Sequence, residues 1–177
     1  MGLLDSHPNK YLPHDEDTNS LRYIDAVHAM VHRGYHYTAT HAVAIGTATA
    51  ATVMITAPAT GAYHLAIGMQ ANNTGYGAFS EAPNATGGTA ITAYNNNRNS
   101  ANVSTLTHTK TATVTSAGTV LQNFVLGTDG KGNVSSGGAG EMRTEWILKP
   151  STKYLFSFTA LNAATRVAMN LSYYLEQ

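Results

Sequence analysis

Hydrophobic and polar side chains alternate through the C-terminal part of the chain, from Glu145 onward. Large apolar residues occupy every second position in three successive segments, the pattern of strands that bury one face. The residues concerned are Trp146, Leu148, Tyr154, Phe156, Phe158, Val167, Met169, Leu171 and Tyr173. Turn-forming residues at 150–152 and 161–164 separate the segments, and Pro150 removes a ladder donor. This part of the chain is therefore predicted to be an all-β packing unit.

The same pattern extends through most of the sequence. It predicts strands near 25–33, 35–45, 51–57, 62–71, 75–80, 89–94, 111–115, 119–126, 141–148, 153–160 and 166–175. Turn signals such as Asn72-Asn73 and Gly87-Gly88 lie between them. Residues 23–29 are compatible with a helical turn or two, but His28, Met30 and His32 suit a strand equally well. Many short strands at this spacing indicate an all-β antiparallel sandwich or barrel, in one domain over residues 23–177.

Residues 1–22 differ from the rest. They contain two prolines, an acidic cluster at 15–17 and scattered apolar residues without a clear period. We predict an extended arm that orders against a partner, with a tail of no specific role as the alternative. Tyr11, Leu12, Pro13 and His14 are the candidate contact residues of this arm, because tails without partners are usually poorer in such residues.

Charged residues make up only 11% of the 177 residues, against roughly 25% in typical soluble proteins. Ten basic and ten acidic residues give no net charge, so nothing favours a nucleic-acid partner. No charged residue occurs between Arg33 and Glu81. This stretch is rich in Ala, Thr and Gly and contains Pro58 and Gly61, so we do not expect a membrane span. A sheet covered by another subunit on one face is the preferred interpretation.

The chain has no cysteine, which excludes disulfides and cysteine-ligated zinc. Residues 1–19 contain no apolar core of the length that a signal peptide needs. Both observations favour synthesis and assembly in a reducing cytoplasm.

Eight histidines are many for this length, and His28, His32, His36 and His41 follow one another closely. On a helix, the spacing of four would form one metal-binding face. On strands, residues four apart are about 13 Å from each other, too far for a single ion. We therefore predict no metal site within one chain and no cofactor. Histidines lining a polar interface and titrating near neutral pH are expected instead, with convergence on a symmetry axis as an alternative.

The sequence contains none of the common catalytic motifs. The carboxylates outside the arm are scattered, and no nucleophile elbow, P-loop or dinucleotide fingerprint occurs. The glycine-rich stretch 127–140 lacks the strand-to-helix context of a phosphate cradle and is predicted to be a loop or hairpin tip. Threonine at every second position from 105 to 115 predicts a hydroxyl-bearing strand face turned to solvent, a glycan or a subunit. We expect that the protein is not an enzyme.

Two segments resemble a known class of proteins. The first is TAYNNNRNSANVSTLTHTKTATVTSAGTVLQNFVLGTDGKG, and the second is the closing EWILKPSTKYLFSFTALNAATRVAMNLSYYLEQ. Together they resemble the decoration, or cement, proteins of tailed-bacteriophage heads. The resemblance implies a jelly-roll-like β-sandwich on the outer surface of an icosahedral virion, often a trimer, clamping neighbouring major capsid subunits. It also implies that the arm, with Tyr11, Leu12, Pro13 and His14, reaches across the coat lattice.

Two alternatives remain. One is a receptor- or glycan-binding head of a phage fibre or spike, for which ten tyrosines and a Thr/Asn-rich surface would be suited. An exposed groove lined by Tyr63, Tyr76 or Tyr94 would place this alternative first. The other is a cupin-type enzyme with histidine ligands, which the absence of any H-x-H unit makes less favoured.

Overall fold

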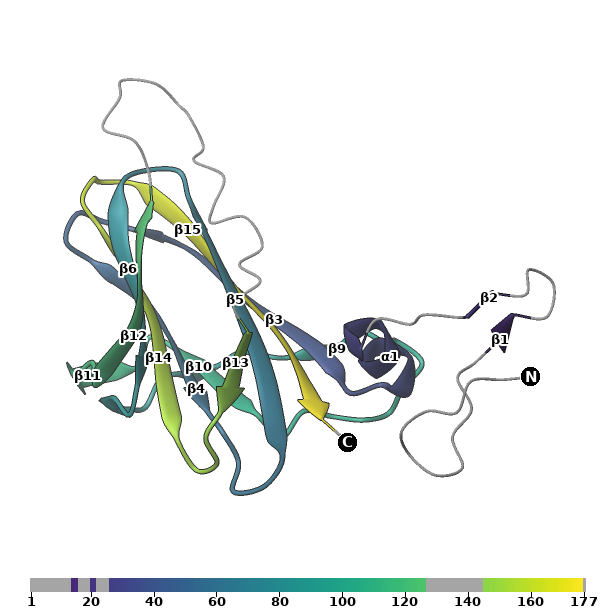
Figure 1. Ribbon diagram of the computed structural model, residues 1–177. Coiled ribbons are helices and arrows are strands. Elements are labelled where there is room, and N and C mark those ends of the chain that lie inside the picture. The colour runs from purple at the N-terminus through teal and green to yellow at the C-terminus, as the bar shows by residue number, and fades with distance from the viewer. Residues whose placement is uncertain (1–13, 16–19, 22–25, 127–144, 177) are drawn as a thin grey trace.

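A computed structural model of the protein describes residues 14–15, 20–21, 26–126 and 145–176. Two antiparallel sheets pack face to face and form a β-sandwich (Figure 1). The five-stranded sheet has the order β13-β5-β15-β3-β9, and the six-stranded sheet has the order β12-β6-β14-β4-β10-β8. The predicted all-β antiparallel sandwich is therefore confirmed.

Eight strands make up the body of the sandwich, and consecutive strands alternate between the two sheets except at β6 and β12, which are neighbours in the six-stranded sheet. They are β3 (His36–Ile45), β4 (Ala50–Thr56), β5 (Ala62–Ala71), β6 (Gly75–Glu81), β12 (Thr119–Leu126), β13 (Glu145–Leu148), β14 (Lys153–Ala160) and β15 (Thr165–Glu176). The first of these pairs with the eighth, the second with the seventh, the third with the sixth and the fourth with the fifth. This nested pairing is the topology of a jelly roll.

The interior between the sheets is aromatic and aliphatic. Its largest fully buried side chains include Tyr63, Tyr154, Tyr173, Phe79, Phe156, Phe158, Met69 and Met169. The apolar residues of the closing segments point inward as predicted, with Trp146 partly buried against the core. Strand β14 has the predicted bounds, and β15 is one residue longer at each end.

An insertion between β6 and β12 closes one open side of the sandwich. It contains β7 (Asn84–Thr86), β8 (Thr89–Ala90), β9 (Tyr94–Asn95), β10 (Thr107–Lys110) and β11 (Thr113–Ser116). Strand β10 pairs with β4 of one sheet, and β9 pairs with β3 of the other. Residues 96–106 therefore cross from one sheet to the other.

The predicted threonine face of 105–115 is not one surface. The tract divides at Thr111, whose φ of 56° lies in the left-handed region. On one side β10 belongs to the six-stranded sheet, and on the other β11 pairs with β7 in a separate ribbon. The period of two is present in the sequence, but the backbone turns in the middle of it.

The β7–β11 ribbon lies over the outer face of the six-stranded sheet. Lys153, which projects from that face, donates a hydrogen bond from Nζ to the Ala85 carbonyl at 3.1 Å. Next to it Met54, Leu155 and Ser80 are adjacent in register and buried, although they point away from the core. The part of this face around Met54, Leu155 and Ser80 is therefore assigned to the cover of the chain's own insertion, whereas Tyr76 and Asn123 on the same sheet are exposed.

The strand predicted near 25–33 is wrong, because Ala26–Arg33 forms the helix α1. Its C-terminus is closed by Gly34 at a φ of 75°. The Gly34 amide donates to Val31 O at 3.0 Å and the Tyr35 amide to Met30 O at 2.9 Å, the two bonds of a Schellman cap. The sequence contained this signal: apolar Val27, Met30 and Val31 at helical spacing, followed by glycine.

The arm is described only at β1 (His14–Asp15) and β2 (Ser20–Leu21), which pair with each other in antiparallel fashion. The predicted loop at 127–140 lies outside the described residues. Among the helices that the structure describes, none is long and apolar enough to cross a membrane.

Candidate functional site

The asparagine-rich turn that begins at Tyr94 holds the helix against the sandwich. Asn95 Nδ2 donates to Gly34 O at 2.8 Å, and Asn102 Nδ2 donates to the same oxygen at 3.2 Å. Asn97 Nδ2 donates to His32 O at 2.9 Å. The last carbonyls of a helix have no partner within the helix. The turn satisfies one of these oxygens, His32 O, and also the carbonyl of the capping residue Gly34, and it thereby fixes the C-terminus of α1.

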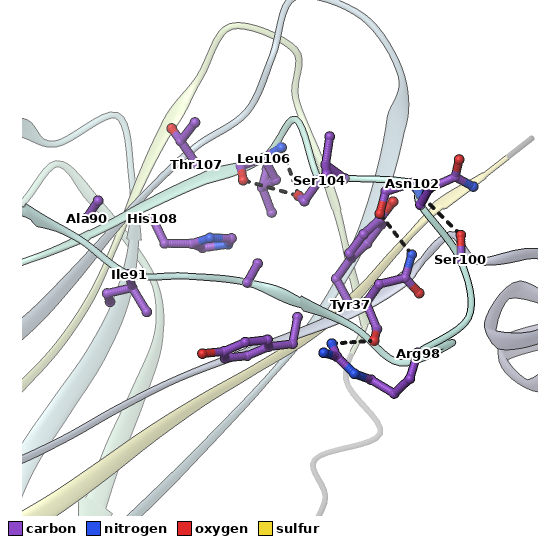
Figure 2. Close-up of a pocket in the computed structure, with 15 residues that line it drawn as sticks. Tyr37, Ala90, Ile91, Arg98, Ser100, Asn102, Ser104, Leu106, Thr107 and His108 are labelled. Carbon is purple, nitrogen blue, oxygen red and sulfur yellow. Dashed lines mark hydrogen bonds between the residues drawn. The ribbon is translucent and has the colours of Figure 1, made fainter.

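The same turn forms the wall of a cavity of about 410 Å³ on the side of the sandwich that the insertion closes (Figure 2). The lining is mixed, with apolar Ile91 and Leu106 beside polar side chains from residues 95–104. Tyr37 contributes from β3. A concave, partly apolar cavity with a few converging polar groups is the usual form of a small-molecule site.

His108 lines this cavity and is 3% exposed, and its ring projects into the space in Figure 2. Burial lowers the pKa of His108 to about 4, so the imidazole is neutral near pH 7. Among the described residues, its Nε2 atom has no hydrogen-bond partner. A buried polar atom without a partner carries a desolvation cost that a bound hydroxyl or water would remove.

Tyr94 stands at the mouth of the cavity and is 58% exposed. The Arg98 guanidinium lies over its ring, with Cζ 5.6 Å from the centroid, and covers one of the two ring faces. Of the three tyrosines considered for a sugar-binding groove, Tyr94 lines an exposed cavity. Tyr63 is buried in the core, and Tyr76 is exposed on β6.

A second surface is the outer face of the five-stranded sheet. Three successive rows across β3, β15 and β5 contain only small or uncharged side chains. These rows are Thr38–Ser172–Ala66, Thr40–Asn170–Gly68 and Ala42–Ala168–Gln70, and we call them the small-residue face. Thr40 Oγ1 donates to Asn170 Oδ1 at 3.1 Å within it. The sequence predicted such an uncharged sheet surface within residues 34–80.

One end of the small-residue face is ionic. His64 lies between two carboxylates, with Nδ1 3.2 Å from Glu145 Oε1 and Nε2 3.2 Å from Glu176 Oε2. Its ring stacks on Tyr174 with centroids 4.6 Å apart. Val27 of α1 closes a cavity of about 190 Å³ over this group. At the other end Arg166 pairs in register with Ala44.

The structure separates the four histidines that the sequence grouped together. His28 and His32 lie on α1, His36 begins β3, and His41 points into the sandwich. His36 Nε2 is 3.2 Å from Ser172 Oγ. Burial lowers the pKa of His36 and of His41, and it lowers the pKa of His108 to about 4, so the expectation of titration near neutral pH is wrong for His108. Within the described residues no group of three or more potential metal ligands occurs.

Of the candidate contact residues, Tyr11, Leu12 and Pro13 lie outside the described residues. His14 begins β1 and pairs in register with Leu21. Sequence reasoning missed His108 and Arg98 as site residues, because the insertion that brings them together is not visible in a local pattern.

No family model matches the chain, and no curated protein or solved structure matches it either.

Proposed function

We propose that the protein is a structural virion protein that decorates the outside of a tailed-phage head and stabilises it by clamping neighbouring major capsid subunits. The observation that supports this role best is the small-residue face. Short uncharged side chains cost less free energy to desolvate than ions do, and Thr40 and Asn170 already satisfy part of their hydrogen bonding with each other. The sequence resemblance to phage decoration proteins points in the same direction.

The small-residue face is too small to form a whole protein interface by itself. Three strands about 4.8 Å apart and about five residues at 3.4 Å along each give an area on the order of 250 Å². A standard protein interface covers about 800 Å² on each partner. The rest of the contact would come from surrounding side chains and from the arm, in which Tyr11, Leu12, Pro13 and His14 remain the proposed contact residues.

The proposed assembly is a homotrimer at three-fold or quasi-three-fold positions of the shell. Three copies that bind together multiply weak contacts, so each can be small. Light scattering of the purified protein tests this part. A mass of three chains is expected, and a monomer at micromolar concentration would contradict the trimer.

The coat contact is tested by co-sedimentation with heads that lack the protein, prepared from the encoding phage. Wild-type protein should sediment with the heads, and the double variant Ala42→Arg/Ala168→Arg should lose at least about tenfold in affinity, since it places two charges in a desolvated interface. Asn123→Arg is the matched control, because Asn123 is exposed on β12 of the other sheet. Equal binding of the double variant and the control would reject the small-residue face as the contact.

The cavity supports a second candidate function, the binding of a glycan or receptor sugar. Tyr94 lines an exposed cavity, which is the condition set for this function in the sequence analysis. The buried Nε2 atom of His108 has no hydrogen-bond partner among the described residues, so it can bind a sugar hydroxyl. We nevertheless rank sugar binding second, against the order attached to this condition in the sequence analysis, because Arg98 already covers one of the two faces of the Tyr94 ring on which a sugar would stack. The cavity is on the side of the sandwich and not on the small-residue face, so one protein can perform both functions.

Saturation-transfer NMR with glucose, galactose and N-acetylglucosamine tests the second function. Transfer to a sugar should disappear in Tyr94→Ala and persist in Tyr76→Ala, an exposed tyrosine from β6. No transfer to any of the sugars, or equal transfer in both variants, would contradict sugar binding at this cavity.

A further inference from the structure

His28 and His32 form a pair on the exposed side of α1. Because the segment is a helix, the spacing of four places their side chains one turn apart on the same face. Their Nε2 atoms are 2.9 Å apart, and both residues are exposed. The two rings meet edge to face, with centroids 4.6 Å apart and an interplanar angle of 68°. Strand geometry would have held the same residues too far apart to share an ion.

The distance between the nitrogens suits a particular coordination geometry. Imidazole nitrogen lies about 2.0–2.1 Å from a bound first-row metal. Two such ligands at a right angle are therefore about 2.9 Å apart, whereas a tetrahedral angle would place them about 3.4 Å apart. The observed 2.9 Å corresponds to neighbouring positions of a square-planar or tetragonal ion. Cu²⁺ and Ni²⁺ prefer that arrangement, and Cu²⁺ binds more tightly in the usual order of affinities.

We propose that His28 and His32 form a two-histidine chelate for a divalent transition metal of tetragonal preference, with Cu²⁺ the tightest-binding ion. Water would occupy the remaining positions, since no third ligating side chain joins the pair in the described part of the chain. When the metal binds, both rings carry their single proton on Nδ1 and present Nε2 to the ion, so the ring that donated the Nε2 hydrogen in the metal-free pair takes up the other tautomer. The hydrogen bond between the rings is replaced by two metal–nitrogen bonds.

The helix is held in place before any metal binds. Asn97 binds the carbonyl of His32 itself, and Asn95 and Asn102 bind that of Gly34. A side chain at Gly34 would collide with Ser100, so the turn packs directly against the helix end. A fixed backbone reduces the conformational entropy that the two ligands lose on chelation. This anchoring distinguishes the pair from two histidines on an isolated helix, where an eight-residue segment would be unstable.

The site is tested by titrating Cu²⁺ into the full-length chain without a histidine tag. Calorimetry and electron paramagnetic resonance monitor the binding. One site per chain should give a tetragonal spectrum with nitrogen hyperfine structure. Loss of only those groups that hydrogen-bond to a metal ligand already lowers metal affinity about 10–100-fold. Removing a ligand itself, in His28→Gln or in His32→Gln, should therefore weaken Cu²⁺ binding at this site at least about tenfold. EDTA should reverse the binding.

The matched control keeps the number of histidines and breaks only their spacing. The double variant His32→Gln/Arg33→His moves the second imidazole about 100° around the helix. It should bind as weakly as His32→Gln. If it binds Cu²⁺ as tightly as wild type, or if His28→Gln does, the metal is held by histidines elsewhere in the chain and the pair is a hydrogen bond only.

Discussion

The outer faces of the two sheets differ although both sheets share one interior. On the six-stranded sheet, Leu155 and Met54 point away from the core and are nevertheless buried, because the β7–β11 ribbon lies over them. On the five-stranded sheet the corresponding positions are small and polar, such as exposed Thr40 and half-buried Asn170, and α1 reaches this face through Val27 at the row of Ser172 and Ala66. Part of one face is thus buried within its own chain. The other is the face that we propose is completed by a separate subunit.

The largest expected effect tests whether the covered face behaves as core. Leu155→Ala should lower the free energy of unfolding by about 3 kcal/mol, because it leaves a cavity under the ribbon. Asn170→Ala, at a facing-out position of the other sheet, should change it by less than about 1 kcal/mol. Urea denaturation of both variants measures the difference. Equal costs would mean that the two outer faces are alike in the isolated protein.

The next effect concerns acid stability, which we assign to the interior and not to either outer face. Burial lowers the pKa of His108 from 6.5 to about 4. The unfolded chain therefore takes up this proton before the native protein does, and stability falls as the pH falls from 6.5 towards 4. Between pH 7.5 and pH 4.5 the loss from this residue is about 2.5 kcal/mol.

His108→Phe retains a ring beside Tyr173 but cannot be protonated. Urea denaturation at the two pH values should show that the variant loses about 2.5 kcal/mol less than wild type, since the carboxylates titrate in both proteins. The same pH dependence in both would show that His108 does not remain neutral in the native state.

The smallest effect tests the attachment of the ribbon. Lys153→Met retains most of the apolar stem but removes the hydrogen bond to Ala85 O, and it should cost about 1 kcal/mol. Hydrogen exchange should rise in β7 and β11 and remain unchanged in β3. A uniform rise in all strands would instead indicate a global loss of stability, with no local release of the ribbon.

Where hydrophobic and polar residues alternate regularly, the local sequence was sufficient to predict the strands. Strands β14 and β15 were predicted with the right inward residues, because a period of two on a buried sheet has only one compatible register. Even there, the pattern did not distinguish Leu155 from Ser157 on the outward side. The difference depends on a ribbon that lies far from both in the sequence.

In other parts of the chain, contacts with residues distant in the sequence decided the local structure. Alternating His28, Met30 and His32 favoured a strand, but the Schellman cap at Gly34 and the asparagines of the 95–102 turn stabilise a helix. The threonine tract kept its period while its backbone reversed at Thr111. Each outcome depends on contacts with a segment that becomes a neighbour only in the folded chain.

The sequence by itself determined the all-β class, the inward residues of the main strands and the uncharged stretch 34–80 that contains β3 and β5, since these follow from side-chain chemistry and a period of two. The tertiary structure decided the jelly-roll pairing, the cavity around His108, the cover over Leu155 and the helix that brings His28 and His32 together. The pairing joins strands far apart in the sequence, and the other three features arise where the insertion at 84–116 meets the sandwich; the free energy of such long-range contacts is not encoded in any short window of residues.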